Sequence, residues 1–360
     1  MISFERAVGR NRFIAPLRNQ ASIDLVWPAR RANKGSTLSH WGSPARRNKA
    51  IAPYAAEAFE SDSVSDSSWL WAVFTIIAAA AQTVRNAAQR ELTGTLGTVG
   101  ATHVRFLFGC PFALIILAGV LMSGAALPRP GVDFWPWVLA GALMQIAATA
   151  LMLSAMGERS FVVAIAYIKT EPIQVALFGL LFLGDRVTAG MAAAIVIATA
   201  GVIVMSLKAG PAAGGSRATI LGLAAGACFA LSAIGFRGAI LSLHDPDYLM
   251  AATFTMATGL VIQAALLSLY LALRDRAVLA AIVRSWRPSL FAGFMGATAS
   301  QFWFLAFALA TAASVRTLAL VEVLFAQAIS RFVFKQKVSA REGIGIVMIV
   351  IGVVLLVWSY

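Results

Sequence analysis

Two carboxylates inside apolar segments are the residues of this sequence best suited to chemistry. Glu171 and Glu322 each lie near the middle of a hydrophobic run of about twenty residues, long enough to cross a bilayer. A charge at the centre of a membrane helix costs about 2.5–3.5 kcal/mol on insertion scales, and burial favours the protonated carboxyl. We therefore interpret the pair as groups that bind a substrate or exchange protons in a membrane cavity. The alternative is a pair of structural glutamates neutralised by basic residues on other helices.

Polar residues accompany Glu171 along its segment. Tyr167, Glu171 and Gln174 follow a four-and-three spacing and therefore share one face of a helix. Lys169 lies two residues before Glu171 and points nearly the opposite way. It could form an ion pair with Glu322 or hold an anionic substrate, and the sequence leaves both open.

A proline follows the first glutamate directly. Pro172 removes one backbone donor and disturbs the helical hydrogen bonds before it, which predicts an interrupted helix beside an ionisable group. Transporter sites often use such interruptions, although a simple proline kink is the alternative. Gln145 and Gln301, in two other apolar segments, could line the same cavity or only join helices.

Further polar residues lie closer to the ends of the apolar segments. Arg85, Arg105 and Arg237 are placed where long side chains can reach the membrane surface, so we expect a structural or topological role for them. His103 is expected to be structural as well.

The composition requires a membrane protein. Of the 360 residues, 59% are hydrophobic and 12% are charged, which is far below the charged fraction of a soluble domain. The apolar segments expected to form transmembrane helices are 68–88, 100–123, 135–156, 161–183, 188–207, 218–240, 248–272, 289–309, 314–334 and 342–359. The fold expected is therefore an all-α membrane protein of about ten transmembrane helices.

The first 67 residues differ from the rest. Ten basic residues occur in the first fifty positions against two acidic ones, and no continuous apolar stretch follows that would suit a secretory signal peptide. We expect a basic, disordered tail near anionic lipid headgroups and no nucleic-acid partner. The composition also resembles that of a transit peptide.

The chain repeats itself. Displacements of 151 and 152 residues align Glu171 with Glu322, Gly201 with Gly352, Gly141 with Gly293 and Arg85 with Arg237. We expect one repeat over 68–207 and a second over 218–359. Five segments per repeat is an odd number, so the repeats would cross the membrane in opposite directions, with a substrate site between them.

Enzyme chemistry finds no support in the motifs. The sequence has only three histidines and two cysteines, and it contains no zinc, haem, Walker or serine-hydrolase pattern. We therefore expect no metal, no cofactor and no catalytic residue. Neither cysteine belongs to a disulfide pattern.

Residues 165–201 resemble the EamA domain of the drug/metabolite transporter superfamily. Pro172, the pair Gly184-Asp185, Arg186 and Gly201 fill the places of its proline, Gly-acidic pair, basic turn and terminal glycine, with Asp where Glu is usual. Arg105 resembles the arginine that often opens the second span of that family. The second copy, 314–352, departs further, with Val323 in place of the proline and Lys335-Gln336 in place of the Gly-acidic pair.

The resemblance covers 68–359 and implies a ten-helix carrier, usually in a bacterial inner membrane, that exports amino acids, metabolites or drugs. The partners expected of such a carrier are a small-molecule substrate and the lipid bilayer, and the two mid-segment glutamates add protons as a coupling ion; the sequence does not indicate an oligomeric state. A lipid or isoprenoid flippase and a non-transporting assembly or sensing subunit are the alternatives.

The orientation in the membrane receives two opposed predictions. The resemblance implies that both termini are cytoplasmic, and the basic tail agrees. The arginines at 274, 276, 284 and 287 and the basic residues at 335, 337 and 341 favour the opposite orientation, because short cytoplasmic loops are rich in Lys and Arg. We adopt the orientation of the family as the expectation.

Overall fold

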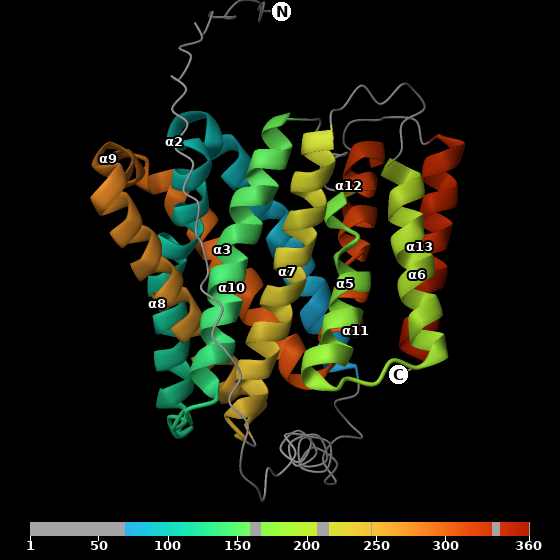
Figure 1. Cartoon of the computed structure of the whole chain (residues 1–360), viewed down its shortest axis with the longest axis horizontal. Coiled ribbons are helices and arrows are strands. Elements are labelled where there is room, and N and C mark those ends of the chain that lie inside the picture. The colour runs from blue at the N-terminus through green and yellow to red at the C-terminus, as the bar shows by residue number, and fades with distance from the viewer. Residues whose placement is uncertain (1–68, 159–166, 207–215, 246, 333–338, 360) are drawn as a thin grey trace, which may run out of the picture. The chain divides into compact units, whose positions relative to one another are not determined.

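The computed structural model describes residues 69–158, 167–206, 216–245, 247–332 and 339–359. The predicted tail, the first residues of the 161–183 segment and the Lys335-Gln336 pair lie outside the described residues. The described regular elements are all helices, which confirms the all-α class (Figure 1).

Six described helices are long and apolar enough to cross a membrane. They are α2 (Leu70–Met122), α3 (Phe134–Glu158), α7 (Ser216–Ser242), α8 (Tyr248–Arg274), α10 (Trp286–Leu309) and α13 (Ala340–Trp358). The shorter helices are α5 (Glu171–Phe178), η3 (Gly179–Leu183), α6 (Ala189–Ser206), α9 (Arg276–Arg284), α11 (Ala312–Leu318) and α12 (Val321–Phe332). The arginine-rich segment between α8 and α10, which was expected to be a short loop, contains α9.

Helix α2 contains two of the predicted segments, 68–88 and 100–123. It has 53 residues, but Gly97 takes φ 66° and ψ 176°, a left-handed backbone conformation that glycine adopts at no steric cost. The chain reverses direction there, as Figure 1 shows near the α2 label. The polar residues between the two apolar segments are thus helical up to Gly97.

Two of the predicted segments are each interrupted by a turn. The turn at 169–170 precedes α5, and the turn at 319–320 separates α11 from α12. Both turns are held by three-residue backbone hydrogen bonds, from Thr170 N to Tyr167 O (3.3 Å) and from Leu320 N to Thr317 O (3.1 Å). Because Val323 occupies the place of the proline in the second copy, the second interruption forms without one.

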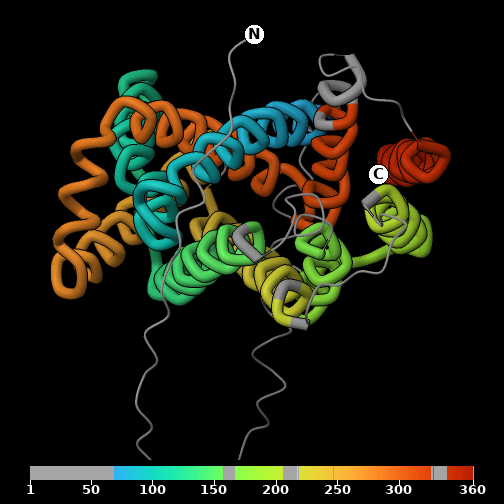
Figure 2. The backbone as a smooth tube through the Cα atoms, turned by 90° about the horizontal axis from the view of Figure 1, so that it is seen from above, coloured from blue at the N-terminus to red at the C-terminus, as the bar shows by residue number. Residues whose placement is uncertain are grey.

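The helices pack mainly as pairs drawn from different repeats. Helix α10 lies along α2, α3 lies along α7, and α6 lies along α13. The core between these pairs is aromatic, with the rings of Phe236 (α7) and Phe304 (α10) 4.7 Å apart. Figures 1 and 2 both show α6 and α13 side by side at one edge.

Helices α6 and α13 approach to backbone contact. A Cβ atom added to Gly201 would lie 2.8 Å from the carbonyl oxygen of Gly345, and one added to Gly352 would lie 2.9 Å from that of Ala194. Gly201 and Gly352 are 151 residues apart, and so are Ala194 and Gly345. The repeat displacement of 151 residues therefore relates one contact to the other. This is an antiparallel contact of the kind made across a twofold axis.

We predict that Gly201→Ala lowers the free energy of unfolding by about 1–3 kcal/mol, because the added methyl group meets backbone atoms of α13 that cannot move independently. Thermal unfolding of the purified protein in detergent would measure the loss. Gly343→Ala is the matched control, since a Cβ atom there would meet no atom within 4 Å. Equal melting temperatures for the two variants would contradict the prediction.

Candidate functional site

Both mid-segment glutamates lie in the first turn of a helix that begins after an interruption. Glu171 is the first residue of α5, and Glu322 is the second residue of α12. A helix N-terminus carries partial positive charge and stabilises a nearby carboxylate. Pro172 lies in the same first turn of α5, where its missing N–H removes no helical hydrogen bond.

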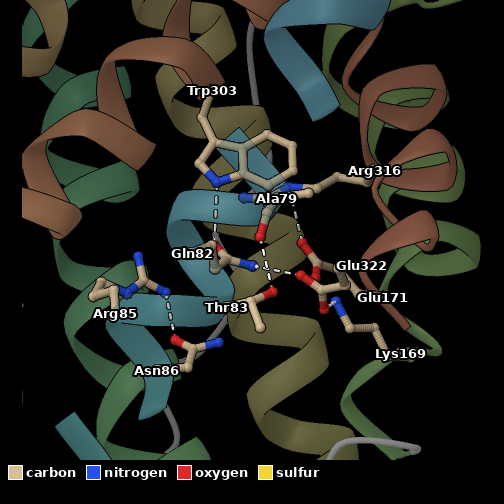
Figure 3. Close-up of polar contacts among 10 residues, drawn as sticks. All are labelled: Ala79, Gln82, Thr83, Arg85, Asn86, Lys169, Glu171, Trp303, Arg316 and Glu322. Atoms are coloured by element: carbon tan, nitrogen blue, oxygen red, sulfur yellow. Dashed lines mark hydrogen bonds and ion pairs between the residues drawn. The ribbon is translucent and has the colours of Figure 1, made fainter. Parts of the chain in front are cut away.

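Two ion pairs join the two predicted repeats. Lys169, in the turn before α5, pairs with Glu322 of α12, so the structure contains the ion pair that the sequence analysis considered. In the other direction, Arg316 of α11 lies 3.1 Å from Glu171, measured from Nε to Oε1. All four side chains are buried (Figure 3). Each glutamate is therefore neutralised from the opposite repeat.

The two pairs are not equally well bonded. The contact between Arg316 Nε and Glu171 Oε1 is close in distance, but within the described part of the chain neither atom forms a hydrogen bond of acceptable geometry. The guanidinium group instead lies 4.4 Å from the ring centre of Trp303, in a cation–π arrangement. Arg316 is thus held by charge and by stacking, and its pair with Glu171 is the less constrained of the two.

A glutamine and a tryptophan connect Glu322 to the rest of the bundle. Gln82 of α2 donates from Nε2 to Glu322 Oε2 (3.4 Å) and accepts at Oε1 from Trp303 Nε1 of α10 (3.1 Å). The sequence analysis did not single out Gln82, Trp303 or Arg316. The only available signal was the presence of a polar or aromatic side chain in an apolar segment.

These groups line a small cavity. Its lining consists of Gln82, Arg85, Asn86, Met152, Ile168, Lys169, Glu171, Phe229, Arg316 and Glu322. Its volume is about 20 Å³, which suffices for about one water molecule. The charged groups therefore leave little space between them in this conformation.

Two of the predicted site residues in the 161–183 segment, Gln174 and Tyr167, do not line the cavity. Gln174 donates to Thr170 Oγ1 (3.2 Å) and lies against Gly226 of α7. Tyr167 accepts a hydrogen bond from the Thr170 hydroxyl at its backbone carbonyl (2.8 Å), and it does not line the cavity. The face shared by Tyr167, Glu171 and Gln174 is lost because the turn at 169–170 interrupts the helix.

The two other glutamines join helices outside the cavity lining. Gln145 of α3 accepts a hydrogen bond from Gln263 of α8 (2.9 Å), and Gln301 of α10 donates to Thr253 of α8 (2.8 Å). Gln145 and Gln301 were expected either to line the cavity or to join helices, and in the structure both join helices.

The expectation that Arg85 and Arg105 reach the membrane surface is wrong. Arg85 is 1% exposed and lines the cavity, because α2 continues beyond the apolar segment to Gly97. Arg105 is 2% exposed and donates to Thr149 of α3 (3.3 Å). His103 is fully buried, 3.0 Å from the hydroxyl of Ser268, as a structural residue would be.

Arg237 has the structural role that was expected. It donates to the carbonyl oxygens of Phe307 (3.1 Å) and Ala310 (3.0 Å) at the end of α10 and lies 3.3 Å from Asp185. Although Arg85 and Arg237 are aligned by the repeat, only Arg85 faces the cavity.

A wider hollow lies one to two turns further along α2 and α3. Its described lining includes Arg90 and Glu91 of α2, Leu153 and Met156 of α3, and Arg217 of α7, and its open volume is about 560 Å³.

Comparison with known proteins agrees with this arrangement. No curated protein matches the chain. A solved structure, described only as the crystal structure of a protein, shares 16% sequence identity with a TM-score of 0.62 and covers 83% of this chain and 100% of its own, which shows a common fold. The model of the EamA-like transporter family matches residues 69–207 and again residues 216–358. Two matches that together span the helical part of the sequence show that this chain belongs to the EamA-like transporter family.

Proposed function

We propose that this multi-pass membrane protein is a secondary active transporter that exports small metabolites, amino acids or drugs by alternating access. The observation that carries the proposal is a small cavity whose charged groups come from both family repeats. A carrier requires such a cavity at the boundary between two halves that can move against each other. The membrane we propose is the inner membrane of a bacterium.

The proposed architecture is ten spans in two inverted repeats. Helix α2 supplies two spans on either side of Gly97, and the interrupted segments that contain α5 and α12 supply one span each. The antiparallel contact between α6 and α13, which exchanges under the repeat displacement, supports the inversion. Residues 68–207 and 218–359 are the two proposed halves, and residues 1–67 the proposed tail.

The interruptions support a site near the middle of the membrane. The helical residues from Glu171 to Leu183 extend about 20 Å, a little more than half of a hydrocarbon core of about 30 Å. In Figure 1, α5 and α12 run from similar levels toward opposite ends of the bundle. Half-helices that begin at mid-depth are a common way to present ions and substrates with helix ends.

Protons are the proposed coupling ion, and the two glutamates are the proposed carriers of the proton. When Glu322 takes up a proton it no longer attracts Lys169, and the same holds for Glu171 and Arg316. Loss of either pair weakens the contact between the halves and leaves a buried cation that is stabilised by water or substrate. Protonation would therefore favour opening of the cavity.

The lining also bears on the flippase alternative. Five charged residues and two amides line the cavity, which suits a polar solute better than an acyl or isoprenoid chain. A non-transporting subunit remains the other alternative, and a transport measurement separates it from a carrier.

We predict that purified protein in liposomes moves small solutes across the membrane in response to a pH gradient. Liposomes loaded with a mixture of amino acids, organic acids and nucleobases would be diluted into medium of a different pH, and mass spectrometry would identify the solutes released. In the double variant Glu171→Gln with Glu322→Gln, release should fall by about tenfold or more and lose its pH dependence, because Lys169 and Arg316 would be buried without a carboxylate.

Two controls accompany this measurement. Arg287→Gln removes a charge from an exposed residue at the start of α10 and should transport as the unmodified protein does. Protein-free liposomes report leakage. Full transport with unchanged pH dependence in the double glutamine variant would refute the proposed coupling, and absence of any protein-dependent release would favour the non-transporting subunit.

We also predict strong energetic coupling between Lys169 and Glu322. Glu322→Gln should destabilise the protein by about 3–5 kcal/mol, because it leaves Lys169 charged and buried. The double variant Lys169→Met with Glu322→Gln should recover much of the loss. Melting temperatures of the two single variants and the double variant measure the coupling.

The control for this cycle pairs Lys169→Met with Arg287→Gln, whose effects should add to within about 0.5 kcal/mol since the residues are not in contact. Additive effects of Lys169→Met and Glu322→Gln would show that the ion pair does not stabilise the closed conformation.

A further inference from the structure

The cavity contains a buried guanidinium group that forms no salt bridge with a carboxylate among the described residues. Arg85 is 1% exposed, and its Nη2 atom donates to the side-chain oxygen of Asn86 (2.7 Å). Its Nε and Nη1 atoms are buried without a hydrogen bond within the described part of the chain. A buried cation with unused donors is costly unless an anion joins it.

Glu322, the carboxylate that acts on Arg85, does not accept a hydrogen bond from its guanidinium group. Glu322 acts electrostatically on Arg85, but its Oε1 atom is taken by Lys169 and its Oε2 atom by Gln82. Glu171 is engaged by Arg316. Lys169, which the sequence left open as an anion ligand, is therefore occupied, whereas Arg85 has two donor atoms, Nε and Nη1, without a hydrogen-bond partner among the described residues.

Positive charge exceeds negative charge around the cavity among the described residues. Two carboxylates, Glu171 and Glu322, face three lining cations, and Arg105 adds a fourth positive charge that interacts with two of them. The four cations are Arg85, Lys169, Arg316 and Arg105. Protonation of either glutamate would increase the excess, so an open cavity would attract an anion.

The stem of Arg85 packs against α10. A Cβ atom added to Gly296 of α10 would lie 3.4 Å from Arg85 Cδ and 3.2 Å from Arg105 Cγ, so both arginine stems rest on this glycine. This packing limits the positions open to the guanidinium group before any ligand arrives, which lowers the entropic cost of binding.

The apolar residues of the cavity lining indicate what the uncharged part of the ligand is. Met152, Ile168 and Phe229 are apolar and line the same cavity as Arg85. A planar guanidinium group binds a carboxylate through two parallel hydrogen bonds. An anionic head beside apolar side chains fits an organic acid better than an inorganic ion.

We propose that the transported substrate is a small organic carboxylate with an apolar body, and that its carboxylate binds to the guanidinium group of Arg85. The proposal deepens the transporter function and rests on it. Because the cavity in this conformation has room for about one water molecule, the substrate binds only when the halves separate.

The test compares a carboxylate with its neutral analogue on the full-length protein in detergent. Benzoate and benzamide have nearly the same shape and differ in charge, and each would be titrated at constant pH and ionic strength while the melting temperature is followed. Benzoate should raise the melting temperature with a saturating dependence, because it binds the folded state, and benzamide should not. Equal shifts for both compounds would overturn the proposal.

Variants locate the site. Arg85→Gln should weaken benzoate binding by about tenfold or more, Arg85→Lys should weaken it less because the charge remains, and the exposed Arg287→Gln should leave it unchanged. An undiminished benzoate shift in Arg85→Gln would overturn the assignment. If neither Arg85 variant folds, the comparison of benzoate with benzamide on unmodified protein still decides whether charge is recognised.

Two further ligands separate the anion classes. Chloride or inorganic phosphate that stabilises the protein as strongly as benzoate would indicate an inorganic anion site and would overturn the organic substrate. Carboxylate binding without release from liposomes would refute the transporter function while leaving the site intact. Release of neutral or cationic solutes, with no carboxylate binding, would refute only the substrate class.

Discussion

The low polarity of the bundle interior is the constraint on which this structure depends. Charges buried there must be compensated within a few ångströms, because water is not available to solvate them. The chain satisfies this requirement across its two repeats, with Lys169 neutralising Glu322 and Arg316 facing Glu171. Because both ion pairs cross between the repeats, the compensation of these charges depends on the association of the two halves.

The same constraint explains why the helices stop where they do. A carboxylate in the first turn of a helix is stabilised by unpaired backbone N–H groups, and both glutamates occupy such positions. The turns before α5 and α12 therefore serve the carboxylates as well as interrupting the helices. The second turn forms without a proline, which indicates that tertiary contacts, and not one residue type, maintain the interruption.

The all-helical class, and the burial of Glu171 and Glu322 in one cavity, were predictable from the sequence. The apolar segments gave the all-helical class, and the depth and repeat alignment of Glu171 and Glu322 singled them out. Arg316 was not predictable, because it lies near the start of an apolar segment and reaches the cavity only through the break at 319–320. The prediction placed Arg85 at the end of a membrane helix because the apolar segment ends at residue 88. The helix itself continues to Gly97, so Arg85 lies further inside the bundle than its hydropathy indicates. Hydrogen-bond partners such as Gln263 for Gln145 depend on which helices become neighbours, and a single sequence does not contain that information.

The contact between α6 and α13 has a consequence for the origin of the chain. Because Gly201 meets Gly345 as Gly352 meets Ala194, the surface is complementary to its own repeat-related copy. A shorter ancestor with a single repeat could have formed this contact between two molecules inserted in opposite directions. Gene fusion would join two such copies in one polypeptide, in which the aligned residues Arg85 and Arg237 now have different surroundings.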